Sequence, residues 1–250
     1  MLALLGAFGY EIADLRRQMA VDEVVANPVC RVYRGQLNGK DCLLVQTGMG
    51  KERAENATQI ILQSYTVNTV ISLGFAAALT PQLRGADVVV CSTLHCATGS
   101  EEKGQGVEVY ASDAHLLSLA SQTLGGGGVS SCIGSSVGVL RLHSSPTRIQ
   151  DLGDAFHAQV ADMESYWIAG IASAHRIPFI AIRSVSETMH DSVEPFDQIL
   201  TSEGRLLWKR ALPCFLLHPW YLMNVLAMFR RVRPARRNLA IFVSELVARI

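Results

Sequence analysis

Three carboxylates interrupt an otherwise apolar stretch between residues 160 and 187. Asp162 and Glu164 stand at the start of a predicted buried helix, and Glu187 follows the predicted strand Phe179–Ser184. A lone carboxylate in an apolar interior is costly unless it is paired, hydrogen-bonded or protonated. Acids at the ends of two adjoining buried elements therefore indicate a site for acid–base chemistry.

Other predicted strands also end in residues that could join this site. Glu11 follows the first strand, the segments Gly48–Gly50 and Gly74–Ala76 follow two more, and Ser186 lies beside Glu187. Ligands of open α/β sheets bind beyond the carboxyl ends of the strands. We therefore predict that four loops converge on one crevice.

The elements that must position these residues alternate between short apolar runs and helical patterns, which is typical of an α/β fold. At 250 residues, one large domain is favoured over two small ones. The predicted strands are Leu2–Ala7, Asp41–Gln46, Thr69–Leu73, Asp87–Thr93 and Phe179–Ser184. The predicted helices are Glu11–Met19, Lys51–Gln63, Ala114–Thr123, Met163–His175 and parts of 197–250.

One of the three acids, Asp162, and the nearby Arg183 are predicted to have structural roles. Asp162 is predicted to cap the first turn of its helix, where a side-chain oxygen accepts bonds from backbone amides. Arg183 lies inside a predicted strand and is expected to hold an internal carboxylate in place.

The net charge of zero conceals two oppositely charged regions. Residues 1–204 hold 13 Lys and Arg against 21 Asp and Glu, whereas residues 205–250 hold nine against one. We interpret 1–204 as the catalytic domain and 205–250 as a helical extension packed on it. The basic charge of the extension would either face the acidic domain 1–204 or contact anionic lipid. We expect no nucleic-acid partner.

The segment 205–237 is both basic and apolar. Its apolar run 211–229 is 19 residues long, near the length of a membrane span, but Pro213 and Pro219 interrupt it. Two interpretations stay open. The segment could lie on an anionic membrane surface, or it could close the sheet or an oligomer interface.

The chain start lacks a basic leader, so we expect a cytoplasmic protein, with peripheral contact at the inner membrane face as a further option. The six cysteines form no CxxC pair and the seven histidines form no i, i+4 pair. We therefore expect reduced thiols and no metal site.

Several landmarks together resemble the superfamily of purine nucleoside phosphorylases and methylthioadenosine/S-adenosylhomocysteine nucleosidases. They are LLGAFGYEIADL, TGMGKERAENAT, VISLGFAAALTPQLRGADVVV and VADMESYWIAGIASAHRIPFIAIRSVSE. The resemblance covers about residues 1–200. It implies a three-layer αβα fold around a mixed, partly barrel-like sheet, a homodimer or higher homo-oligomer, and cleavage of the bond between a purine and ribose.

The resemblance also implies roles for individual residues. Glu11 would activate the attacking water, and Glu187 would protonate or hydrogen-bond the leaving base. Glu164 would hold the ribose hydroxyls, with Met163 packed under the sugar. Phe196 matches an aromatic residue that covers the 5′ side.

The chain departs from the family pattern at two places. Phe75, next to Gly74, replaces a small or hydroxyl residue near the sugar. Glu187 replaces an Asp and is one methylene longer, so Asp191 is a candidate substitute or helper. Ser186 either bonds the base or caps a turn.

Hydrolysis is favoured over phosphorolysis, and no cofactor is expected. The arginine that precedes the central turn in phosphorylases has no match in 68–73, and Glu11 occupies the water-activating position. Phosphate would be a co-substrate only for a phosphorylase.

The pattern SSVGVLRLHSSPTRIQDL…VADMESYWIA also resembles the hopanoid-associated branch of the superfamily, which acts on adenosylhopane. That resemblance implies an adenine nucleoside with a lipid-linked 5′ carbon, which would suit the apolar tail. The rival interpretation is a catalytically weak protein that binds nucleosides or serves as a scaffold at a membrane surface.

Overall fold

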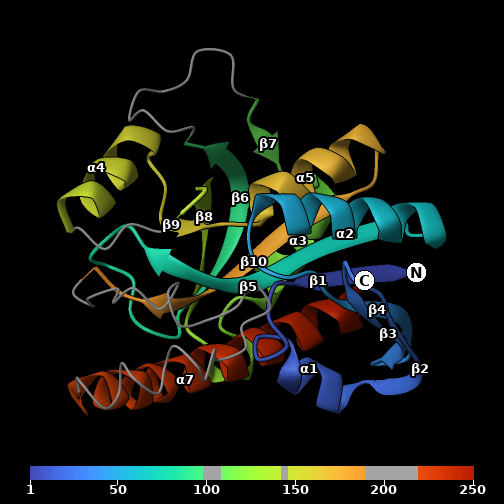
Figure 1. Ribbon diagram of the computed structural model, residues 1–250. Coiled ribbons are helices and arrows are strands. Elements are labelled where there is room, and N and C mark those ends of the chain that lie inside the picture. The colour runs from blue at the N-terminus through green and yellow to red at the C-terminus, as the bar shows by residue number, and fades with distance from the viewer. Residues whose placement is uncertain (98–107, 142–145, 190–218) are drawn as a thin grey trace.

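A mixed sheet forms the centre of the computed structural model, which describes residues 1–97, 108–141, 146–189 and 219–250, with the backbone alone at 146–148 and 219–231 (Figure 1). The described strands are β1 Leu2–Gly6, β2 Ala20–Ala26, β3 Arg31–Leu37, β4 Lys40–Gln46, β5 Thr69–Ala78, β6 Val88–Cys96, β7 Tyr110–Ala111, β8 Ser131–Gly138, β9 Val160–Asp162 and β10 Phe179–Glu187. The described helices are α1 Ala13–Gln18, α2 Lys51–Ser64, α3 Ala114–Thr123, the 3-10 turn η1 Gly126–Gly128, α4 Pro146–Phe156, α5 Ser165–Ala174 and α7 Pro219–Arg249.

Part of this sheet closes on itself. The strand order is β10-β6-β8-β9-β5-β1-β4-β3-β2, and an additional pairing joins β10 to β5. The strands β10, β6, β8, β9 and β5 therefore form a barrel-like ring, and β1 to β4 extend from it as an open sheet. The pairings are mixed, since β5 is parallel to β1 and β10 but antiparallel to β9.

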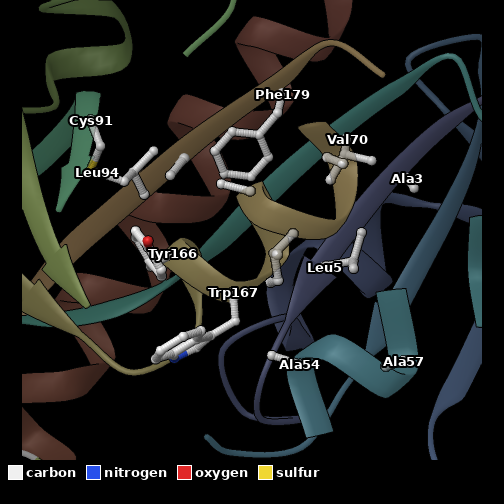
Figure 2. Close-up of a cluster of buried hydrophobic side chains, with 14 of the residues drawn as sticks. Ala3, Leu5, Ala54, Ala57, Val70, Cys91, Leu94, Tyr166, Trp167 and Phe179 are labelled. Atoms are coloured by element: carbon white, nitrogen blue, oxygen red, sulfur yellow. The ribbon is translucent and has the colours of Figure 1, made fainter. Parts of the chain in front are cut away.

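Helices cover both faces of the sheet, with α2 and α5 on one side and α1 and α7 on the other (Figure 1). Under α2 and α5 lies a cluster that includes Leu5, Val70, Trp167 and Phe179. Figure 2 shows how Trp167 of α5 and Ala54 of α2 meet in this interior. The alternation of side chains along each strand supplies apolar groups to both faces, so both need a helical cover.

The C-terminal part of α7 covers the opposite face. Leu239, Phe242 and Leu246 are buried in the cluster that holds Leu4 of β1 and Ile180 of β10. Among the described helices, none combines the length and apolarity that a membrane span requires.

Several predicted boundaries are wrong, and three of them lie in the candidate site. Strand β10 runs to Glu187 instead of ending at Ser184. Val160–Asp162 is a strand, and α5 begins only at Ser165. Residues Gly74–Ala78 continue β5, although the strand was predicted to end at Leu73. Strand pairing decides all three cases, because Ala77 and Ala78 of β5 pair with β9, and Glu187 of β10 pairs with Ala77.

The hairpin β2–β3, strand β8 and helix α4 were also missing from the sequence prediction. Every residue of β2 is exposed, so the strand lacks the apolar alternation by which a strand is recognised.

Phe242→Ala tests whether α7 belongs to the core. Phe242 is 1% exposed, so its truncation should lower the free energy of unfolding by about 3–5 kcal/mol in denaturant titration. Ala248→Ser on the exposed side of the same helix is the control and should change little. A loss below about 1 kcal/mol for Phe242→Ala would contradict this packing.

Candidate active site

A buried ion pair organises the interior of the barrel-like ring. Arg183 on β10 places Nη2 3.2 Å from Asp162 Oδ1 and donates a 2.8 Å hydrogen bond to Ser72 Oγ on β5. Ser136 on β8 donates a 2.6 Å bond to Asp162 Oδ2. Strands β5, β8, β9 and β10 therefore meet in one network, which satisfies charges that would otherwise be costly to bury.

Asp162 also accepts bonds from the start of α5. Its Oδ1 atom accepts from the amides of Glu164 and Ser165 at 2.9 and 2.6 Å. Burial opposes ionisation, but Arg183 and the hydrogen bonds from Ser136 and Ser165 outweigh it and hold the pKa of Asp162 below its usual value. The predicted contact with the helix amides is confirmed, although Asp162 lies on β9, and so is the predicted role of Arg183.

Glu11 is the most enclosed of the predicted catalytic acids, with 4% of its surface exposed. The amide of Phe8 donates to Oε2 at 2.8 Å, and the amide of Phe75 donates to Oε1 at 3.0 Å. Burial raises the pKa of the Glu11 carboxyl, although both amides and the nearby Arg183 charge oppose the rise. The result is a fixed carboxylate with increased proton affinity.

Gly74 allows Glu11 and Arg183 to approach the strand. A Cβ atom at Gly74 would lie 2.9 Å from Arg183 Nη1 and 3.1 Å from Glu11 Oε1. Both contacts are tighter than ordinary Cβ contacts, so a larger residue here would displace the Arg183 guanidinium or the Glu11 carboxylate. Phe75 contributes its amide, and its side chain is half-buried.

Glu164 lies at the junction of β9 and α5, and Met163 precedes it. The amide of Gly50 donates a 2.8 Å bond to Glu164 Oε1. Gly50 has φ 89°, in the left-handed region that favours glycine. Desolvation and the neighbouring charges of Asp162 and Glu11 raise the pKa of Glu164 to about 8.

Backbone bonds bring the loops of the site together. The amides of Thr47 and Gly48 donate to the carbonyls of Gly6 and Ala7 at 2.9 and 3.0 Å, which joins the loop after β4 to the loop after β1. With the bonds of Glu11 to β5 and of Glu164 to Gly50, these contacts gather residues that are far apart in the sequence.

Ser186 and Glu187 end β10 and are partly exposed. Ser186 Oγ lies 3.4 Å from the carbonyl oxygen of Ala76, and Glu187 pairs with Ala77 of β5 after a register shift. Both residues therefore lie on the strand pair that carries Arg183 and Gly74. Phe196 and Asp191 lie outside the described residues.

The sequence interpretation missed the groups that hold the acids. They are the amides of Phe8, Phe75 and Gly50, and the hydroxyl of Ser136, which donates to Asp162. A backbone amide has no residue-type signal, so these donors could not be found from the sequence. The glycines at 50 and 74 were the available indication that the chain approaches closely there.

Comparison with known proteins shows that this chain is similar to a family of enzymes. The family model of the phosphorylase superfamily matches residues 1–207. A 5′-methylthioadenosine/S-adenosylhomocysteine nucleosidase of Tolumonas auensis is 32% identical over 199 residues, which cover 74% of this chain and 85% of the relative. A nucleosidase of the same name from Glaesserella parasuis is 26% identical over 80% of this chain and 91% of its own.

Solved structures share the fold. A 5′-methylthioadenosine/S-adenosylhomocysteine nucleosidase from Neisseria meningitidis, in complex with methylthio-immucillin-A, has a TM-score of 0.79 at 24% identity and covers 100% of this chain and 99% of its own. The futalosine hydrolase of Helicobacter pylori has a TM-score of 0.78 at 16% identity, with 100% and 97% covered. These matches confirm the predicted α/β fold with a barrel-like sheet.

Glu164→Gln tests the environment of this carboxyl. With a pKa of about 8 in the folded protein and an ordinary value of 4.5, Glu164 binds a proton in the folded state that the unfolded state has released. Wild-type stability relative to Glu164→Gln should therefore fall as the pH rises from 4.5 to 8.

Denaturant titrations at about pH 5, 6.5 and 8 measure this difference. Glu52→Gln, which alters an exposed acid of α2, is the control and should give a constant difference. A constant difference for Glu164→Gln as well would contradict the raised pKa.

Proposed function

Because the chain belongs to the phosphorylase superfamily, we propose that it is a nucleosidase that hydrolyses the N-glycosidic bond of a purine nucleoside. The observation that carries this proposal is the Glu11 carboxylate, held by two amides beside the Arg183–Asp162 pair. A buried, fixed carboxylate with a raised pKa is suited to accept a proton from water.

In the proposed reaction, water attacks the anomeric carbon of the sugar while Glu11 takes its proton. The bond to the base breaks, and its electron pair leaves with the base. The transition state resembles an oxocarbenium ion, so nearby negative charge stabilises it. The products are the free base and the ribose derivative.

Glu164 is proposed to bind the ribose hydroxyls. Two carboxyl oxygens suit two neighbouring hydroxyls, and the Gly50 amide fixes one of these oxygens. Because the pKa of Glu164 is raised to about 8, its carboxyl carries a proton in the free enzyme near neutral pH. This proton can be donated in a hydrogen bond to a ribose hydroxyl. Met163 would pack under the sugar ring.

The leaving base needs a proton, and Glu187 is the proposed donor. It ends β10 four residues after Arg183, and Ser186 beside it could bond the base. Asp191 is a candidate helper from the same part of the sequence. Phe196 would cover the 5′ side of the sugar.

Two features support hydrolysis over phosphorolysis. The stretch where phosphorylases carry an arginine holds Ser72, which accepts a bond from Arg183. Arg183 itself is paired with Asp162, so its charge is already compensated by a carboxylate. A phosphate dianion would compete with that carboxylate for the same guanidinium.

Free adenine released from adenosine and 5′-methylthioadenosine, with and without phosphate, tests this proposal. We expect release without phosphate, a loss of at least about 100-fold in kcat for Glu11→Gln, and a smaller loss for Glu187→Gln. Circular dichroism must show that the variants fold. Phosphate dependence would overturn hydrolysis, and nucleoside binding without turnover by the wild type would favour the rival binding or scaffold protein.

We further propose adenine as the base and an apolar, lipid-linked 5′ substituent of the adenosylhopane type. Adenine is supported by the names of the related nucleosidases. The lipid substituent is supported by the apolar and basic sequence of 205–237, whose residues from Pro219 onward belong to α7. A peripheral contact with anionic lipid would give such a substrate access to the site.

Substrates with 5′-methylthio and long 5′-alkyl groups separate these options. We expect kcat/KM to be at least about 10-fold higher for the long chain, because each buried CH₂ contributes about 0.8 kcal/mol. The protein should also sediment with anionic but not zwitterionic vesicles, and less so at high salt. Efficient cleavage of methylthioadenosine without vesicle binding would overturn the lipid-linked substrate.

A further inference from the structure

Arg236 of α7 contacts the loop that carries Glu11 at two points. Its guanidinium carbon lies 4.4 Å from the centre of the Tyr10 ring, and its Nε atom donates a 2.8 Å bond to Asp14 Oδ2. Tyr10 and Asp14 flank Glu11 in the sequence. The side chain of Arg236 is only 13% exposed, so water screens the ion pair weakly.

Ile12 and Leu15 anchor this segment in the core, but α1 is short and makes few contacts of its own. Helix α1 has six residues and its N-cap, Ile12, makes no side-chain capping bond. A helix of this length is unstable alone, and its geometry depends on tertiary contacts. A displacement of about 1 Å in a catalytic group can cost on the order of 100-fold in rate.

Helix α7 is itself held in place by contacts that do not involve Arg236. Phe242 and Leu246 anchor it in the core, and Asn238 donates a 2.9 Å bond to the carbonyl of Ala86. Removal of the Arg236 guanidinium would therefore leave α7 in place and remove only its contacts with Tyr10 and Asp14. The next residue, Arg237, is exposed and provides a matched control.

We propose that Arg236 is a positioning residue for Glu11, so that the C-terminal helix completes the active site. The stacked ring of Tyr10 fixes the loop before Glu11, and the ion pair with Asp14 fixes the first turn of α1 after it. The carboxylate is thereby held where the amides of Phe8 and Phe75 reach it. This inference rests on the proposed role of Glu11 as the group that accepts the water proton.

Kinetics of Arg236→Ala, Arg236→Lys and Arg237→Ala test the inference. For Arg236→Ala we expect kcat to fall about 10- to 100-fold, KM to change less than about 2-fold, and the acid limb of the pH profile of kcat to move. Arg236→Lys keeps a cation for Tyr10 and Asp14 and should recover part of kcat. Arg237→Ala should match the wild type.

Hydrogen exchange of the peptide 6–14 provides a readout independent of activity. Arg236→Ala should exchange faster than Arg237→Ala in this peptide, with the 239–247 part of α7 unchanged. Unchanged loop exchange would overturn the inference, and so would faster exchange with a wild-type kcat. If the wild type releases no base, the proposed function and the catalytic role of Arg236 both fail, and exchange then shows whether Arg236 still holds the loop.

Discussion

The ion pair between Arg183 and Asp162 is the constraint on which the rest of the site depends. Neither charge is tolerable alone in this interior, so the barrel-like ring must bring the two strands that carry them together. The hydroxyls of Ser72 and Ser136 complete the network from two more strands. Glu11 and Glu164 lie beside this pair: the Arg183 charge lowers the pKa of both carboxyls, and the Asp162 charge raises the pKa of Glu164.

The acids owe their placement to main-chain groups as much as to side chains. The amides of Phe8, Phe75 and Gly50 hold Glu11 and Glu164, and these donors come from three separate segments. A backbone amide acts in the same way whatever side chain the residue carries. The unusual Phe75 is therefore compatible with a working Glu11, because its contribution to that carboxylate is its N–H.

Several elements were predicted correctly because the apolar pattern of the segment itself determines them. Helices α2 and α3 and the strand β1 carry regular apolar patterns and lie where they were predicted, within a residue or two. The α/β fold and the family are confirmed. The site roles, the domain boundary near 204, the oligomer and the membrane contact stay predictions, and Asp191 and Phe196 lie outside the described residues.

The sequence by itself determined the fold class and the superfamily: the alternation of apolar runs and helical patterns indicates an α/β fold, and four motifs over about residues 1–200 resemble one superfamily. Only the tertiary structure decided that Val160–Asp162 is a strand and that Gly74–Ala78 extends β5. It also decided which amides hold Glu11, and that α7 reaches the loop of Glu11 through Arg236. Local patterns report the burial and periodicity of each segment, whereas these features depend on pairing between segments up to about two hundred residues apart, which one-dimensional patterns do not record.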